Sequence, residues 1–402
     1  MFENILAPEI QQYVYDHEND DIQELILKNK EILGVSPALV AEQISGRKKA
    51  KEKLPTWFHT KKIIYPPTIN LEQCSSEVTA NFKAKILSSA ETNSVADLTG
   101  GFGVDTFSFS KYVKEVHYIE PNKDLFEIAC HNFKALASEI IGHCSTAEDF
   151  VLSQRRKGAT FDAIYIDPSR RKSTQRVFKL ADCVPDIISL QPELFLLTDK
   201  MLIKTSPLLD IQQGLSELKH VSRIYVVAIK NEVKELLFLC INGVEEDPEI
   251  HAVNFANENP DVFTIAVADE KALTVSFGDP QQYLYEPNAA IQKAGAFKSV
   301  AQFFGLTKIH PNTHFYTRDT LVPDFPGRTF KIEAIVKPDK KELLKFFPEG
   351  KANITTRNYP LAPEELKKKT GLKDGGDKFL IGFSGEKKKF LVVGERILVG
   401  RS

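Results

Sequence analysis

The sequence predicts an α/β protein: a seven-stranded, mostly parallel, doubly wound sheet with an antiparallel last strand, plus an N-terminal helical region and C-terminal α+β modules. Seven apolar segments lie between Ser94 and Asn242, and segments long enough for a helix separate the first five. This alternation favours parallel strands with helical crossovers. Only a few residues separate the last two segments, so these two strands must be antiparallel. The predicted strands are SVADLT (94–99), EVHYIE (115–120), EIIGHC (139–144), FDAIYID (161–167), DKMLIKTS (199–206), SRIYVVAI (222–229) and KELLFLCING (234–243).

Helices are predicted before the sheet. Residues 1–74 have a helical pattern, in which Ser36 as N-cap and Pro37 as first helical residue begin one helix. A serine at position 75 or 76 is the predicted cap of the next helix. We expect the apolar side chains of that helix to be Val78, Phe82 and Ile86.

After the sheet the pattern changes to shorter elements. Residues 262–277 resemble a hairpin, residues 288–305 a helix, and further strands follow. A chain of 402 residues is too long for one core. We therefore expect four domains: an N-terminal helical region (1–74), an α/β domain (75–246), a small connecting α+β domain (247–322) and a basic C-terminal domain (323–402).

Charge is unevenly distributed along the chain. Residues 323–402 contain 18 Lys and Arg against 11 Asp and Glu, a net charge of +7 in a chain whose total is −2, so the remainder carries −9. A basic module on an acidic body indicates a polyanionic partner for that module.

The remaining composition is that of a cytoplasmic protein. The N-terminus has no secretory signal, and no apolar run approaches the roughly 20 residues of a membrane span. The five cysteines are odd in number and scattered, so we expect five buried thiols, with no disulfide scaffold and no metal site.

The stretch SVADLTGGFGVDTFSFS (94–110) predicts a strand, a glycine-rich turn and a helix, the order found at nucleotide-binding crevices. Asp97 ends the strand, and Gly101 and Gly103 follow it. Glu120 ends the second strand, where a carboxylate can accept both ribose hydroxyls of an adenosine. Ala147 follows the third strand, beside the expected adenine.

Two adenosine cofactors fit such a crevice, and the local charges choose between them. Thr106 replaces the third glycine of a dinucleotide-binding loop, and Asp105 would lie where the pyrophosphate binds, which is unfavourable for an anion. S-adenosylmethionine instead carries an ammonium and a sulfonium, which suit a pocket lined by Asp97, Asp105, Glu120 and Asp167. We therefore predict S-adenosylmethionine as the cofactor.

With these motifs, the chain resembles the class I S-adenosylmethionine-dependent methyltransferases, especially their RNA-modifying branches. The resemblance implies that Asp97, Gly101, Gly103 and Asp105 lie at the methionine-binding loop, with Glu120 at the ribose and Ala147 at the adenine. It also implies that Asp167 and Pro168, in IYIDPSRR, belong to the catalytic motif. The segment from about Pro323 is similar to a THUMP-like module, which implies RNA, either tRNA or rRNA, as the partner.

The acceptor atom is not decided by these motifs. No aromatic residue follows Pro168, unlike the usual base-amine enzymes, and no cysteine nucleophile follows the sixth strand, which disfavours pyrimidine C5 chemistry. A base nitrogen held by Asp167 and Pro168 is the preferred acceptor. The alternatives are a non-catalytic RNA-binding protein with a degenerate fold, a small-molecule methyltransferase, and ribose 2′-O-methylation. The last would use a tetrad of Lys83, Asp167, Lys204 and Glu235.

Three basic residues complete the predicted site. Lys204 is the third predicted catalytic residue, beside Asp167 and Pro168. Arg170 and Arg171 are the predicted substrate-binding residues, as clamps for backbone phosphates.

Overall fold

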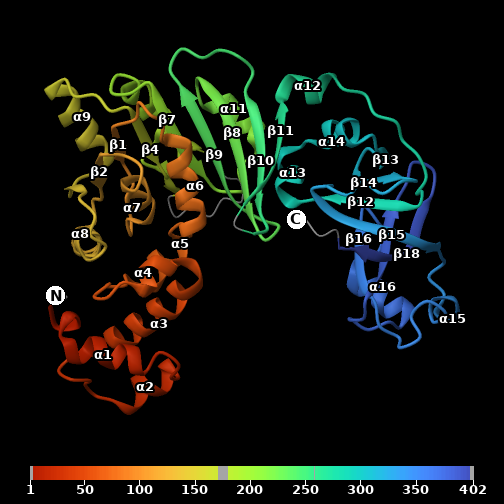
Figure 1. Cartoon of the computed structure of the whole chain (residues 1–402), viewed down its shortest axis with the longest axis horizontal. Coiled ribbons are helices and arrows are strands. Elements are labelled where there is room, and N and C mark those ends of the chain that lie inside the picture. Colours follow the sequence, from red (N-terminus) through yellow and green to blue (C-terminus); the bar gives the residue numbers. More distant parts are fainter. Residues whose placement is uncertain (1–2, 171–179, 258, 399–402) are drawn as a thin grey trace. The chain divides into compact units, whose positions relative to one another are not determined.

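A computed structural model describes residues 3–170, 180–257 and 259–398 (Figure 1). The chain divides into two compact units. Unit 1 comprises Met1–Ser222 and Leu237–Glu245, and unit 2 comprises Arg223–Leu236 and Glu246–Ser402. The mixed α/β architecture confirms the predicted fold class.

Unit 1 begins with short helices. These are η1 (Glu3–Leu6), α1 (Pro8–Asp16), α2 (Ile22–Lys28), α3 (Pro37–Lys53), α4 (Pro55–His59), α5 (Thr68–Gln73) and α6 (Glu77–Leu87). Helix α3 begins as predicted, with Ser36 as N-cap and Pro37 as the first residue. The N-cap of α6 is Ser76, whose hydroxyl accepts a hydrogen bond from the Thr79 amide. The predicted apolar face of α6 is wrong in part, because Val78 is exposed.

The parallel strands of unit 1 carry the candidate site. In the order β3-β2-β1-β4-β7 each strand pairs in parallel with its neighbour, which confirms the first five predicted strands. The strands are β1 (Ser94–Asp97), β2 (Glu115–Ile119), β3 (Ile141–His143), β4 (Ala163–Ile166) and β7 (Lys200–Thr205). The helices among and after them are α7 (Val104–Ser110), α8 (Lys123–Ala135), α9 (Ala147–Lys157), α10 (Ile187–Leu194) and α11 (Ile211–Glu217). Between β4 and α10 lie β5 (Ser169–Arg170), η2 (Leu180–Asp182) and β6 (Cys183–Val184), and β5 pairs antiparallel with β6.

The next two strands form the predicted hairpin. Strands β8 (Val221–Ile229) and β9 (Glu232–Ile241) are joined by Lys230 and Asn231, both with positive φ, which is typical of a tight two-residue hairpin turn. The predicted count of seven strands is wrong, because two more strands continue the sheet to nine. In unit 2, β10 (Glu249–Phe255) pairs in parallel with β8, and β11 (Asp261–Ala266) pairs antiparallel with β10.

Two element predictions after β11 are also wrong. The second half of the expected hairpin is helix α12 (Val267–Ala272), whose sequence VADEKA is rich in helix-forming residues. The single helix expected over 288–305 is two helices, α13 (Ala289–Ala294) and α14 (Phe297–Phe304). Gly295 ends the first of them, because its φ of 73° is left-handed.

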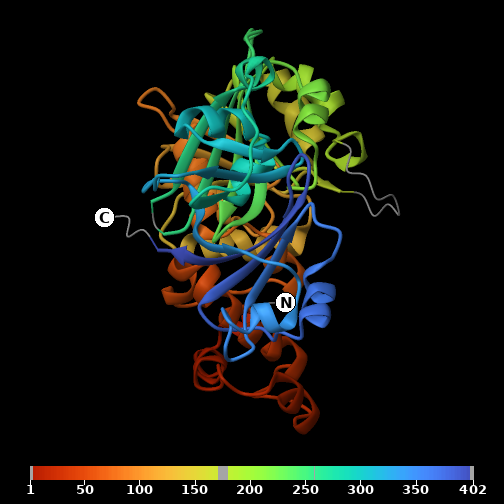
Figure 2. The same cartoon turned by 90° about the vertical axis from the view of Figure 1, so that its right-hand side faces the viewer.

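The rest of unit 2 is one seven-stranded sheet in the order β13-β14-β12-β15-β18-β17-β16. Figure 2 gives a second view of its strands. The elements are β12 (Tyr283–Pro287), β13 (Thr307–His310), β14 (Thr313–Arg318), β15 (Gly327–Ile335), α15 (Lys340–Leu343), β16 (Asn353–Arg357), α16 (Pro363–Thr370), β17 (Lys378–Ser384) and β18 (Lys389–Ile397). Strand β12 pairs with β15, so hydrogen bonds of one sheet join residues on either side of Pro323. The four-domain division stays a prediction.

The cysteines are less buried than the sequence predicts. All five cysteines are free thiols, but only Cys183 and Cys240 are buried, while Cys144 is exposed. The expectation of five buried thiols is therefore wrong.

Across residues 3–170, 180–257 and 259–398, no helix has the length and apolar character needed to cross a membrane.

Candidate cofactor and acceptor site

The glycine-rich loop between β1 and α7 needs its glycines. Gly101 and Gly103 have φ values of 55° and 87°, in the left-handed region that favours glycine. A Cβ atom on Gly103 would lie 2.5 Å from Cζ of Phe133, and one on Gly100 would lie 2.1 Å from Cε2 of Tyr118. The loop therefore packs closely against side chains of β2 and α8 as well as turning tightly.

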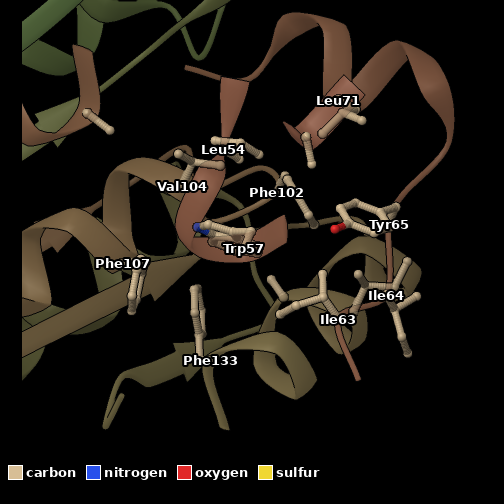
Figure 3. Close-up of a cluster of buried hydrophobic side chains, with 14 of the residues drawn as sticks. Leu54, Trp57, Ile63, Ile64, Tyr65, Leu71, Phe102, Val104, Phe107 and Phe133 are labelled. Carbon is tan, nitrogen blue, oxygen red and sulfur yellow. The ribbon is translucent and has the colours of Figure 1, made fainter. Parts of the chain in front are cut away.

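The phenyl ring of Phe102 anchors this loop in a hydrophobic core (Figure 3). Phe102 is 2% exposed, and its ring centroid lies 4.6 Å from that of Trp57, which comes from α4. Trp57 is fully buried and also contacts Phe107 edge-on. Trp57 is therefore a packing residue of this core.

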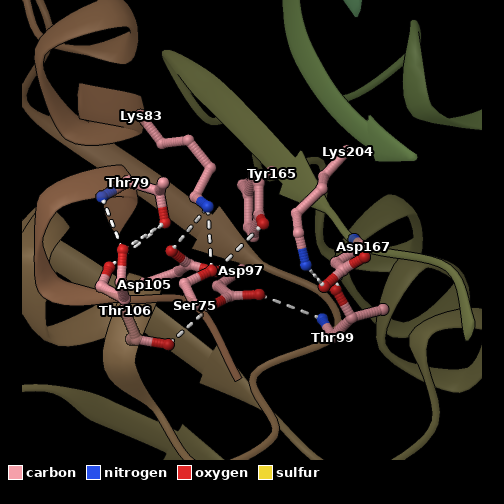
Figure 4. Close-up of polar contacts among 11 residues, drawn as sticks. Ser75, Thr79, Lys83, Asp97, Thr99, Asp105, Thr106, Tyr165, Asp167 and Lys204 are labelled. Carbon is pink, nitrogen blue, oxygen red and sulfur yellow. Dashed lines mark hydrogen bonds and ion pairs between the residues drawn. The ribbon is translucent and has the colours of Figure 1, made fainter. Parts of the chain in front are cut away.

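Asp97 ends β1 with a buried carboxyl group (Figure 4). Its oxygens accept hydrogen bonds from the Thr106 hydroxyl at 2.6 Å and from the Thr99 amide at 3.1 Å. Burial raises the pKa of Asp97 to about 8, with the nearby carboxylate of Asp105 acting in the same direction. Sequence reasoning noted Thr106 as a missing glycine but missed that its hydroxyl holds Asp97.

Glu120, directly after β2, holds the loop from the other side. Its carboxylate accepts hydrogen bonds from the Gly101 amide at 3.0 Å and the Asn122 amide at 2.8 Å. Burial raises its pKa. A carboxylate has about four lone-pair sites, so two backbone bonds leave acceptor capacity for hydroxyl groups. The Tyr118 hydroxyl donates to the Gly101 carbonyl at 2.6 Å, a contact with no sequence signal.

Asp105 lies in the first turn of α7, but its carboxylate is already engaged. It accepts hydrogen bonds from the hydroxyls of Ser75, at 2.8 Å, and Tyr165, at 3.0 Å. The ammonium nitrogen of Lys83 lies 3.2 Å from its Oδ1, and the Lys83 side chain is completely buried. Lys83 also donates to Ser75 at 2.8 Å. Lys83 therefore balances the negative charge of Asp105, which the sequence analysis predicted to lie beside the cofactor.

The carboxyl end of β4 places Asp167 beside β7. Lys204, on β7, donates a charge-assisted hydrogen bond to the Asp167 carboxylate, and the Asp167 amide donates to the Thr99 hydroxyl at 2.6 Å (Figure 4). The side chain of Asp167 is 33% exposed, so it can be reached from solvent. The predicted catalytic residues Asp167 and Lys204 therefore lie together, and Pro168 follows directly.

The other predicted site residues lie at separate places. Ala147 is the buried first residue of α9. Arg170 belongs to β5, and Arg171 lies outside the described residues. Glu235 lies on β9 in unit 2, whereas Lys83 belongs to unit 1.

Comparison with known proteins identifies the family. Residues 283–326 match a ferredoxin-like domain model, and residues 327–396 match a THUMP domain-like model. The crystal structure of a putative methyltransferase from Porphyromonas gingivalis W83 is 34% identical, covers 98% of both chains and superposes with a TM-score of 0.86. The chain belongs to the class I S-adenosylmethionine-dependent methyltransferases with a C-terminal THUMP-like domain.

Curated relatives agree with this family. Two uncharacterized S-adenosylmethionine-dependent methyltransferases, from two strains of Mycobacterium tuberculosis, are 23% identical over 261 residues. The match covers 61% of this chain and 64% of the length of each of these two relatives. The resemblance stated from the motifs is confirmed, including the THUMP-like module at the basic end of the chain.

Proposed function

We propose that the protein binds S-adenosylmethionine at the carboxyl ends of β1 and β2. The observation that carries this proposal is the hydrogen bond between the Gly101 amide and Glu120, because it joins the glycine loop to the predicted ribose carboxylate at 3.0 Å. Asp97 lies beside the same loop as the acceptor for the ammonium of the methionine part. These groups fit a cationic adenosine ligand better than an anionic dinucleotide.

We further propose that the acceptor is a base nitrogen in RNA, a tRNA or an rRNA. S-adenosylmethionine, when bound, supplies the methyl group. The protein's task is to hold the acceptor in line behind that group, and such positioning supplies much of the catalysis in displacement reactions. Asp167 can accept a hydrogen bond from an amino group there, and Pro168 fixes the direction of the following chain.

A ribose hydroxyl is the second candidate acceptor, and the ion pair of Lys204 with Asp167 favours it. A hydroxyl must lose its proton during methyl transfer. A neutral lysine amine beside it can accept that proton, and a lysine ammonium can stabilise the negative charge on the oxygen. Against the full tetrad, Lys83 is completely buried and its ammonium contacts Asp105. Base nitrogen therefore remains the preferred proposal.

The choice of RNA rests on the basic THUMP-like module, whose positive charges suit a phosphate backbone. Arg170 and Arg171, which follow the Asp-Pro pair after one serine, are proposed to bind substrate phosphates. A truncation at residue 323 would remove β15, the partner of β12, so point substitutions test the RNA role better.

Calorimetric titration tests the cofactor proposal. We expect S-adenosylmethionine to bind and Glu120→Ala to weaken its binding by about 1–3 kcal/mol, because ribose hydroxyls would lose their acceptor. Glu115→Ala, at the exposed amino end of the same strand, should leave binding unchanged. Tight binding of NADH with no binding of the methyl donor would contradict the proposal.

A further inference from the structure

A buried carboxylate in unit 2 holds two arginines. Glu286, on β12, is 3% exposed. Arg328 lies directly opposite it on β15 and donates to Oε2 through Nε, at 2.7 Å, and through Nη2. Arg357, at the end of β16, donates through Nε to Oε1 at 2.8 Å. One carboxylate thus fixes two guanidinium groups from different strands.

This cluster carries an excess positive charge and unused donors. Two guanidinium groups and one carboxylate leave a net charge of +1. The side chains of Arg328 and Arg357 are 29% and 43% exposed, so the excess charge reaches solvent. Within residues 259–398, Nη1 of Arg328 and Nη2 of Arg357 have no hydrogen-bond partner.

The second arginine is more than the carboxylate needs. Arg328 alone forms a two-bond ion pair with Glu286 and neutralises its charge. Arg357 adds a second cation that must give up part of its hydration, which stability alone does not require. Planar guanidinium groups match the oxygens of a phosphate, and holding them in place beforehand lowers the entropy cost of binding. Lys367, in contrast, is already paired with two acids, Glu364 and Asp374.

We propose that Arg328 and Arg357, oriented by Glu286, bind a backbone phosphate of the RNA substrate. The cluster lies where the segments matched to the ferredoxin-like and THUMP-like models meet, since Glu286 belongs to the first and Arg328 to the second. This inference rests on the proposal that the substrate is RNA.

The test uses the full-length chain and fluorescein-labelled bulk tRNA and rRNA fragments, titrated at several salt concentrations. Arg357→Gln should weaken binding about tenfold and lower the slope of log K against log salt by about 0.7–0.9, the contribution of one phosphate contact. Arg357→Lys keeps the charge and should restore the slope. Lys345→Gln removes one exposed positive charge elsewhere in the module and should change neither quantity.

Each outcome decides one claim. Arg328 still pairs with Glu286 in Arg357→Gln, so this variant should fold, and thermal unfolding checks it. If Arg357→Gln lowers the melting temperature but leaves affinity and salt slope equal to wild type, the cluster is structural and the inference fails while RNA binding stands. If the wild-type protein binds neither RNA, the inference fails together with the RNA substrate.

Discussion

The indole ring of Trp57 packs against the phenyl ring of Phe102, with ring centroids 4.6 Å apart. Phe102 lies between the two glycines with positive φ in the loop after β1, and Trp57 belongs to a helix from the N-terminal region. The contact therefore makes the shape of the glycine loop depend on the packing of residues that precede the sheet. The N-terminal helices of unit 1 therefore help to shape the proposed cofactor site.

We expect Phe102→Ala to destabilise the protein by about 3–5 kcal/mol, the usual cost of truncating a buried Phe, and to weaken donor binding as well. Trp57 is the only tryptophan, so its fluorescence reports on this contact directly. Phe315→Ala, at a fully buried position in unit 2, is the matched control. It should cost similar stability without changing donor affinity or Trp57 emission. Equal donor affinity in both variants would contradict the coupling.

Asp97 should make stability fall as pH rises. Its pKa is about 8 in the folded protein against 3.8 ordinarily, so the folded state holds an extra proton between these values. Its contribution to the free energy of unfolding is therefore greatest below pH 4 and is lost as pH rises toward 8. Asp97→Asn should flatten this decline, as measured by denaturant unfolding at several pH values, while weakening donor binding. Burial also raises the pKa of Glu120, which contributes a decline of the same sign in both proteins. Parallel curves would show that Asp97 is not the titrating group.

A comparison of Gly103→Ala with Gly158→Ala separates backbone strain from steric crowding. Any L-residue in the left-handed region costs roughly 1–2 kcal/mol, and Gly103 adds a contact of 2.5 Å between the new Cβ and Phe133. Gly158 has a similar φ of 65° but open space around it, so Gly158→Ala should show the strain alone. We expect a larger loss of stability for Gly103→Ala, and a loss of donor affinity in that variant only. Equal losses in thermal and calorimetric measurements would show that the loop tolerates the added atom.

The sequence predicted the carboxyl edge of the sheet well, because strand ends follow from local apolar runs. Asp97, Glu120 and Asp167 were each predicted at the end of a strand. In the structure Asp97 is the last residue of β1, and Glu120 and Asp167 directly follow β2 and β4. What could not be predicted depends on residues distant in the chain. Tyr165 reaches Asp105 across 60 positions. A pattern of apolar spacing carries no information on such a partner.

Helix α6 shows the same limit of prediction from apolar spacing. Its spacing indicated Val78, Phe82 and Ile86 as the packed face, yet Val78 is exposed and the charged residue Lys83 is completely buried. A buried lysine is tolerated because Asp105 pairs with it, and that partner is 22 residues away in the sequence. Strand β10 was not predicted, and β11, predicted as the first half of a hairpin, was not assigned to this sheet. Pairing to an existing sheet edge leaves no local signal in the sequence.

The most direct measurement follows a labelled methyl group. The protein is incubated with methyl-labelled S-adenosylmethionine and RNA from a strain lacking it, and the RNA is digested to nucleosides for mass spectrometry. We predict a nucleoside methylated on a base nitrogen, abolished in Asp167→Ala although the donor still binds, and retained in Lys200→Met, at the other end of the strand that carries Lys204. A sole 2′-O-methylated product that is lost in Lys204→Met would contradict the choice of nitrogen. RNA that stays unlabelled while the protein binds the donor would contradict RNA methylation itself.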